Sequence, residues 1–253
     1  MTITLAIANQ KGGVAKTTSV ASIGSALAEL GQRVLLVDLD PQACLTFSLG
    51  IDPEDLELSV HHVLTKGIDV DEVILTTEDE VDILPATIEL ARAEADLLTR
   101  TGREQALKVV LDDIDDYDWI LLDCPPSLGV LTVAALTAAD AVIVPLQCET
   151  LSHRGVGQLL DTVHDVRRFT NKSLQVWGVL PTLFDGRTNH ARTVLETISE
   201  TYSLDVIEPP IPKTIKFAEA PAAGRSILAT AKSSKGAQAY RQVAANLMSR
   251  AGS

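Results

Sequence analysis

The sequence predicts an α/β protein with a single doubly wound, mostly parallel sheet and helices on both faces of that sheet. Short apolar, β-rich segments alternate along the chain with segments of helical periodicity. Strands that are apolar throughout are typical of a parallel sheet that helices cover on both sides. No repeat or linker divides the 253 residues, which suffice for a sizeable core. We therefore expect one domain over residues 1–253.

Six apolar segments predict the strands, and helical patterns follow most of them. The strands cover residues 2–8, 33–38, 81–86, 119–123, 141–146 and 175–182. The helices cover Thr17 to Leu30 and residues 87–98, 103–111, 150–169, 189–200 and 235–250. Gly31 follows the first helix, where glycine commonly ends a helix in the left-handed conformation.

The composition argues against several classes of protein. No apolar segment approaches the roughly 18 residues of a membrane span, and no signal peptide is evident. The three cysteines, Cys44, Cys124 and Cys148, form no metal-type pair and suggest a reducing cytoplasm. Cys124 has no evident base and is expected to be a buried apolar residue, whereas His61 and His62 are expected at the surface.

Charge is distributed unevenly along the chain. The net charge is −13, with −18 in residues 1–150 and +5 in residues 151–253. This asymmetry suggests a basic binding face on an acidic protein, although the fold can interleave the two halves.

Polar segments follow four predicted strands directly. They cover residues 9–18, 38–42, 123–127 and 145–150. Ligands of doubly wound sheets bind at the carboxyl ends of the strands. We therefore expect these four segments to converge on one binding site.

The first segment, NQKGGVAKTT, resembles a phosphate-binding loop but departs from the usual pattern. That pattern is Gly, four residues, Gly, Lys and then Ser or Thr. When Lys16 and Thr17 take the last two positions, Gln10 and Ala15 occupy the positions of the two glycines.

The chemistry of this segment still favours phosphate. A helix that begins near Lys16 offers unpaired N–H groups and the positive end of its dipole. Gly12 and Gly13 let a ligand approach the backbone closely. Lys16 offers a charge for the β- and γ-phosphates, and the Thr17 hydroxyl is a ligand for Mg²⁺. A solvated lysine beside a glycine turn is the less favoured alternative.

The motif KGGVAKTT resembles the deviant Walker A motif, Lys-Gly-Gly-x-Gly-Lys-Thr-Thr, of the ParA/MinD ATPases. VLLVDLDPQ and ILLDCPPSLG resemble the next two motifs of that family, in the same order along the chain. FDGRTN (184–189) and IPKTIKFAEAP (211–221) resemble later segments of its chromosomal ParA branch, called Soj. The resemblance covers nearly the whole chain and identifies the loop as a P-loop of the deviant class.

The resemblance implies roles for individual residues. Lys16 contacts the phosphates, Lys11 reaches the nucleotide of a partner subunit, and Asp40 orients the attacking water; these three are the catalytic candidates. Thr17, Asp38 and Asp123 belong to the Mg²⁺ site, with a strand-end cap as the alternative for Asp38. ATP is bound by Lys11, Gly12, Gly13, Val14, Ala15, Lys16, Thr17, Thr18 and, at the adenine, Pro212.

Two departures from the family pattern matter for these expectations. Ala15 replaces the usual glycine, and its methyl group strains a backbone that prefers positive φ.

Arg187, Lys213 and Lys216 correspond to or adjoin the DNA-contacting face of the Soj branch. Lys213 and Lys216 stand where the family usually has Arg, so the charge is kept but the bidentate fork is lost.

The resemblance implies an ATPase that partitions DNA. In this family the ATP-bound sandwich dimer binds double-stranded DNA without sequence preference, and a ParB-like protein stimulates hydrolysis and release. We therefore expect a cytoplasmic, nucleoid-associated homodimer that does not bind membranes and has no helix-turn-helix before the first strand.

Three alternatives remain open at this point. One is a MinD-like regulator of division, although the segment AYRQVAANLMSRAGS is a poor membrane anchor. Another is an orphan ParA-like protein with a different cargo. The third is a metabolic or redox relative, such as the nitrogenase iron protein or dethiobiotin synthetase.

Overall fold

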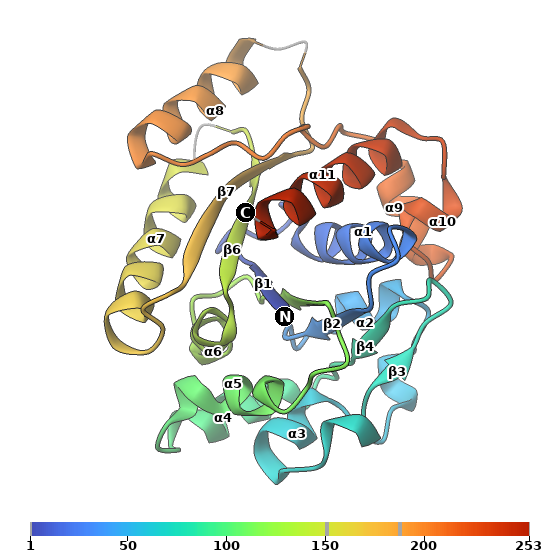
Figure 1. Cartoon of the computed structure of the whole chain (residues 1–253), viewed down its shortest axis with the longest axis vertical. Coiled ribbons are helices and arrows are strands. Elements are labelled where there is room, and N and C mark those ends of the chain that lie inside the picture. Colours follow the sequence, from blue (N-terminus) through green and yellow to red (C-terminus); the bar gives the residue numbers. More distant parts are fainter. Residues whose placement is uncertain (1, 150–151, 187–188, 253) are drawn as a thin grey trace.

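The computed structural model describes residues 2–149, 152–186 and 189–252 (Figure 1). A seven-stranded sheet lies at the centre, in the order β3-β4-β2-β5-β1-β6-β7. Only β3 at the edge runs antiparallel to its neighbour. The strands are β1 (Ile3–Ile7), β2 (Val34–Asp38), β3 (Leu75–Thr76), β4 (Asp82–Leu84), β5 (Trp119–Asp123), β6 (Ala141–Gln147) and β7 (Gln175–Thr182).

Helices cover both faces of this sheet, as the sequence predicts. One face carries α1 (Lys16–Glu29), α2 (Cys44–Ser48), α9 (Lys216–Ala222), α10 (Ile227–Thr230) and α11 (Lys235–Ala251). The other carries α3 (Val60–Lys66), α4 (Leu90–Leu98), α5 (Ala106–Asp112), α6 (Val130–Ala138), α7 (Ser152–Phe169) and α8 (Asn189–Tyr202). No helix within the described ranges combines the length and apolarity needed to cross a membrane.

Alternating side chains of each central strand supply two separate cores. In β1, Leu5 and Ile7 pack beneath α1 and α11, whereas Ala6 packs against the opposite helices. All three side chains are fully buried. A strand with both faces buried has no polar side to reveal its period, which explains the continuous apolar segments of the sequence.

Helix α11 lies along α1 and ties the two ends of the chain together (Figure 1). Its Tyr240 is fully buried, and the Tyr240 hydroxyl lies 2.9 Å from the hydroxyl of Ser19 on α1. The ring of Tyr240 also meets Phe217 of α9 edge to face, with 5.7 Å between the centroids. The helix that begins at the predicted phosphate loop is therefore held from its outer side.

The six predicted strands and six predicted helices are all present, with ends that differ by a few residues. Gly31 has the left-handed φ of 82° expected after α1. Several short elements were not predicted: β3, α2, α3, α6, α9 and α10. Most are too short to establish a period, and α6 (VLTVAALTA) is so uniformly apolar that no face stands out.

The parallel register places the site residues at one edge of the sheet. Asp123 at the end of β5 is level with Asp38 of β2 on one side and with Ile7 of β1 on the other. Segments that follow these strands therefore emerge together, as expected for a doubly wound sheet.

Candidate functional site

The loop between β1 and α1 turns sharply to place Lys16 at the start of a helix. Gly13 and Ala15 both have left-handed backbones, with φ of 73° and 63°. Glycine adopts this conformation freely, but an L-residue with a Cβ is strained by it. Ala15 is also the residue before the first turn of α1 and makes no side-chain cap. The strain expected from the sequence is therefore present in the fold.

Neighbouring strand ends hold this loop in place. Asn9 donates from its side-chain amide to the carbonyl of Pro145 (2.7 Å) and accepts from the N–H of Lys11 (3.0 Å). Thr182 at the end of β7 donates its hydroxyl to the carbonyl of Val14 (2.9 Å). These contacts fix the loop before any ligand arrives, which lowers the entropy cost of binding.

Lys16 lies inside the loop with its ammonium directed at the backbone. Its Nζ donates to the carbonyl of Lys11 over 3.3 Å, and only 7% of the residue is exposed. Burial lowers the pKa of Lys16, while the nearby Asp123, Cys124 and Asp40 counteract this effect. A largely buried cation at the start of a helix, where the first backbone N–H groups are unpaired, is well suited to a polyphosphate.

Asp38 is fully buried, and its carboxylate holds the start of the next helix. One oxygen accepts from the N–H of Asp40 (3.1 Å), and the other accepts from the N–H and hydroxyl of Thr46 (2.9 and 2.8 Å). Burial raises the pKa of Asp38 to about 6, although these hydrogen bonds favour the charged form. Both oxygens are thus engaged by the chain itself, and a role for Asp38 at the metal stays a prediction.

Asp123 differs from Asp38 because no backbone N–H among the described residues donates to its carboxylate oxygens. The residue is fully buried, and neither oxygen has a hydrogen-bond partner of normal geometry among the described residues. Burial and the neighbouring Asp38 raise the pKa of Asp123 well above its usual value; the Thr17 hydroxyl and Lys16 oppose this rise. A buried pair of unsatisfied oxygens beside a hydroxyl suits a hard divalent cation such as Mg²⁺.

The other two catalytic candidates approach the site from different strand ends. Asp40 follows β2 and accepts from the N–H of Gln42 through one carboxylate oxygen (3.0 Å). Lys11 forms an ion pair with Glu149 after β6, with 2.5 Å between Nζ and Oε2. The four polar segments therefore converge at one edge, as the sequence predicts. The individual roles of Lys11 and Asp40 stay predictions.

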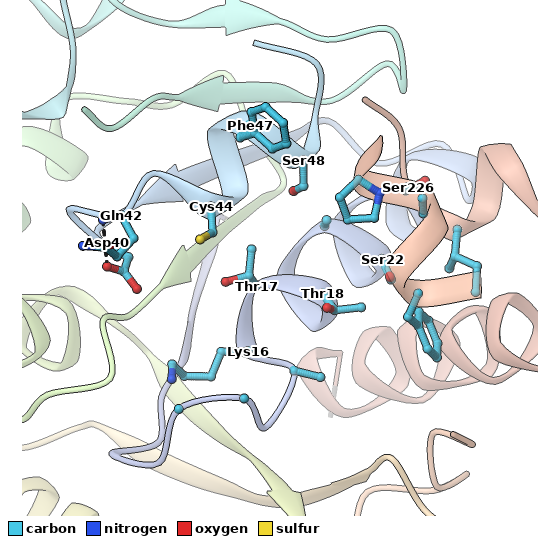
Figure 2. A pocket seen from close by; sticks show the side chains of 18 of the residues that line it. Lys16, Thr17, Thr18, Ser22, Asp40, Gln42, Cys44, Phe47, Ser48 and Ser226 are labelled. Atoms are coloured by element: carbon cyan, nitrogen blue, oxygen red, sulfur yellow. Dashed lines mark hydrogen bonds between the residues drawn. The ribbon is translucent and has the colours of Figure 1, made fainter. Parts of the chain in front are cut away.

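A cavity of about 570 Å³ opens beside the loop (Figure 2). Lys16, Thr17 and Asp40 lie at one end of this cavity, and Ser22 and Ser226 lie at the other. Its walls come from the phosphate loop and α1 on one side and from α2, α9 and α10 on the other. Sequence reasoning missed the walls supplied by α2 and α10, because nothing local marks Phe47 or Ser226 as cavity residues.

Pro212, the residue expected to contact the adenine, lies near the loop but does not line either cavity. Pro212 pairs with Phe184 in an isolated bridge, and the N–H of Phe184 donates to the carbonyl of Ile211 (2.9 Å). Ile211 and Thr214, on either side of Pro212, line a smaller cavity of about 290 Å³ that also borders Ala15. The segment thus lies next to the loop, whereas Pro212 itself lines neither cavity.

Of the three residues predicted to contact DNA, the structure describes two. Arg187 lies outside the described residues. Lys213 and Lys216 are exposed near the start of α9, and Ile215 between them is 73% exposed. Lys216 pairs with Glu219 on the next turn of its helix (2.7 Å). Both lysines are exposed, and their contact with DNA stays a prediction.

The expectation that His61 and His62 lie at the surface is wrong. They are 8% and 9% exposed, on α3. His62 accepts from the N–H of Ser59 (3.2 Å) and caps this helix, and His61 lies 3.5 Å from Glu89. Accepting that bond occupies the Nδ1 lone pair of His62, so its imidazole is committed to the helix cap. Cys124 is fully buried, as expected.

This combination of a strand, a glycine loop, a buried lysine and carboxylates at adjacent strand ends defines a P-loop nucleotide-binding protein. Residues 2–176 match the family model described as "AAA domain". The sporulation initiation inhibitor protein Soj of Bacillus subtilis is 44% identical over 248 residues, covering 96% of this chain and 98% of Soj.

Two further relatives extend this result. The chromosome partitioning protein ParA of Myxococcus xanthus is 37% identical over 97% of this chain and 88% of its own length. A crystal structure described as cobyrinic acid a,c-diamide synthase from Mycobacterium smegmatis, with bound ADP and magnesium, is 55% identical. It superposes with a TM-score of 0.90 over 100% of this chain and 96% of its own. The chain belongs to the ParA/MinD family of P-loop ATPases.

Removing the strain at Ala15 is expected to stabilise the protein. Ala15→Gly should raise the free energy of unfolding by about 0.5–1 kcal/mol, because glycine tolerates the left-handed backbone. Ala21→Gly, within α1, should lower it by about 1 kcal/mol, because glycine is unfavourable inside a helix. Urea denaturation of both variants measures this difference. Destabilisation by both substitutions would contradict strain at Ala15.

Asp123→Asn should alter how stability depends on pH in the absence of divalent cations. The folded protein holds the Asp123 proton more tightly than the unfolded chain does, so this residue lowers stability as pH rises from about 4 through its folded pKa. The difference in the free energy of unfolding between the variant and the parent should therefore shift in favour of the variant from pH 4.5 to pH 8.

The matched control for this experiment is Asp118→Asn. Hydrogen bonds from Arg33 lower the pKa of Asp118, so Asp118 stabilises the fold at higher pH and its replacement should show the opposite trend. Urea denaturation at the two pH values measures both differences. If Asp123→Asn changes the free energy of unfolding equally at both pH values, Asp123 does not hold its proton more tightly in the folded state.

Proposed function

We propose that the protein is an ATP- and Mg²⁺-dependent ATPase that partitions DNA, for a chromosome or a plasmid. The observation that carries this proposal is the buried Lys16 inside a preformed phosphate loop beside the buried carboxylate of Asp123, to which no backbone N–H of the described residues donates. Full-length similarity to proteins named Soj and ParA supports partition as the use of this site.

The chain offers a group for each requirement of phosphoryl transfer. Lys16 and the N–H groups at the start of α1 bind the β- and γ-phosphates. Thr17 and Asp123 hold Mg²⁺, which neutralises charge on the phosphate oxygens. Asp40 projects from the loop after β2 and orients the water that attacks the γ-phosphorus. Asp38 keeps the Asp40 backbone in place through its hydrogen bond.

Dimerisation couples this chemistry to DNA. We infer that the ATP-bound protein forms a sandwich dimer in which Lys11 leaves Glu149 and approaches the nucleotide of the partner subunit. The dimer binds double-stranded DNA without sequence preference, and a ParB-like protein stimulates hydrolysis and release. Lys213, Lys216 and Arg187 supply cations for the phosphate backbone. This function would place the protein in the cytoplasm, on the nucleoid.

A diamide synthase is the second candidate, because the Mycobacterium smegmatis structure carries that description at 55% identity. By its name, such an enzyme forms amides on cobyrinic acid and needs a nitrogen donor. The three thiols are poor nucleophiles for releasing nitrogen from an amide donor. Burial raises the pKa of Cys148 to about 11 and also raises those of Cys124 and Cys44. Incubation with cobyrinic acid, ATP and ammonia or glutamine tests this candidate by product mass.

Asp40→Ala should separate nucleotide binding from turnover. Loss of the carboxylate removes the group that orients water but leaves the phosphate loop intact, so ATP affinity should stay within about threefold while phosphate release falls about a hundredfold or more. Asp69→Ala, which removes a similar turn contact far from the loop, is the control and should change neither. Phosphate release near the parent rate would refute the role of Asp40.

DNA binding should depend on the nucleotide state and on salt. The protein is titrated with random-sequence duplex DNA without nucleotide, with ADP and with a slowly hydrolysed ATP analogue, over a salt series. Only the ATP form should bind, with affinity that falls steeply as salt rises. Lys213→Ala should reduce the slope of log K against log salt by about 1. Lys172→Ala, in an exposed loop, should leave it unchanged, and absence of binding in all states would contradict partition.

A further inference from the structure

Two histidines and a glutamate meet where α3 packs against α4, on the face of the sheet opposite α1 (Figure 1). His61 and His62 lie in the first turn of α3, and Glu89 directly precedes α4, at its N-cap. One possible ligand atom of each side chain lies within 4.8 Å of those of the other two. In the described ranges this is the one group of three His, Cys, Asp or Glu side chains close enough to share a metal ion.

His61 supplies an imidazole nitrogen that the fold leaves without a hydrogen bond. The residue is 8% exposed, and its Nδ1 atom has no hydrogen-bond partner among the described residues. This atom lies 3.5 Å from Oε2 of Glu89, and so it is directed at the carboxylate. Two ligand atoms of a tetrahedral zinc ion lie about 3.4 Å apart when each bond is about 2.1 Å long. The nitrogen and the oxygen therefore have the spacing of two ligands of one ion.

Glu89 gives an ion a path to this buried nitrogen. Its side chain is 47% exposed, whereas that of His61 is 10% exposed. Apart from the approach to His61, the Glu89 carboxylate has no hydrogen bond or ion pair within the described part of the chain. It is therefore free to turn aside in solvent, admit the ion and then bind it.

His62 is held by a different bond, which a metal ion would replace. Its Nδ1 atom accepts from the N–H of Ser59 (3.2 Å). A metal on Nδ1 takes the lone pair directly. A metal on Nε2 displaces the proton that the neutral ring carries there, and the ring proton then sits on Nδ1, where the Ser59 hydroxyl at 3.5 Å accepts from it. Either way the ring gives up the N–H of Ser59 and becomes free to turn toward the other two ligands.

This exchange limits the affinity of the site without closing it. Loss of one hydrogen bond lowers affinity about fivefold. Lys66, one turn further along α3, adds some repulsion of a bound cation. In compensation, burial and the charge of Lys66 lower the pKa of His62, so this ring is mainly neutral at pH 7. A neutral imidazole is the form that binds metals.

The donor set favours zinc over the harder cations. Two imidazoles and one carboxylate bring a single negative charge, whereas Mg²⁺ and Ca²⁺ require several oxygen ligands. Imidazole and carboxylate both suit Zn²⁺, and three protein ligands leave a fourth position for water. The proposed Mg²⁺ site at Thr17 and Asp123 offers only oxygen, so the two sites differ in the ion that they favour.

We propose that His61, His62 and Glu89 form a second metal site, which binds one Zn²⁺ ion and ties α3 to α4. Binding exchanges the hydrogen bond between Ser59 and His62 for a bond to the metal. None of the three ligands lines the cavity beside the phosphate loop, so this site does not depend on the proposed ATPase.

Calorimetry measures zinc binding to the full-length chain, without a histidine tag and with excess Mg²⁺ to compete for the oxygen site. One Zn²⁺ per chain should bind. Glu89→Gln removes the charged ligand and His61→Gln removes the buried nitrogen. Each should weaken zinc binding at least about tenfold, because even the outer partners of metal ligands contribute that much. His61→Gln alters a buried position and can lower stability, whereas Glu89→Gln changes an exposed side chain and keeps the test decisive.

His164→Gln is the matched control, because His164 is exposed on α7. Cys44→Ser removes an exposed thiol, which is another common zinc ligand. Neither variant should change zinc affinity. Loss of binding in Cys44→Ser but not in Glu89→Gln would place the ion elsewhere and overturn the proposal, as would no zinc binding to the parent.

NMR of the imidazole nitrogens separates a shared site from adventitious binding at the surface. Zn²⁺ should shift a ring nitrogen of His61 and one of His62 together, and leave those of His164 in place. The amide proton of Ser59 should shift at the same time, because it loses its acceptor. None of these changes should occur in Glu89→Gln at the same zinc concentration. Shifts at one ring alone, with the Ser59 amide unchanged, would refute the three-ligand site.

Discussion

The site depends on two buried carboxylates at the carboxyl ends of adjacent strands. The parallel register of β2 and β5 brings Asp38 level with Asp123, where water reaches neither. Two negative charges in such surroundings repel each other and are poorly solvated, so the folded chain favours protonation of this pair. A cation offsets the repulsion and the lost solvation of the two carboxylates, and the nearby Lys16 does so only in part.

The two carboxylates resolve this conflict differently. Asp38 is satisfied by the N–H groups of Asp40 and Thr46, and so shapes the segment that carries Asp40. Asp123 has no such backbone donors among the described residues, so its oxygens stay open to an incoming ligand. Asp38 thus stabilises the local backbone, whereas the oxygens of Asp123 remain available to a ligand. Both residues nevertheless end apolar strands in the same sequence pattern.

Much of this arrangement could be predicted from the sequence, because it depends on local patterns. The long strands and helices carry clear periodicity, and the loop residues from Gly12 to Thr17 are recognisable by type and spacing. What could not be predicted depends on contacts between distant segments. The partnership of Asp38 with Thr46, the burial of His61 and His62, and the approach of Gly50 to Gly224 leave no mark in the residues on either side.

The position of α11 has a consequence for any contact with lipid. Its apolar residues, including Val243 and Leu247, are buried, and α1 lies along the helix. To insert into a bilayer this helix would have to detach, which would expose Tyr240 to water and break its bond to Ser19. That bond supports α1 one turn after the phosphate loop. In this chain, anchoring by the last helix and an intact nucleotide site are therefore in physical competition.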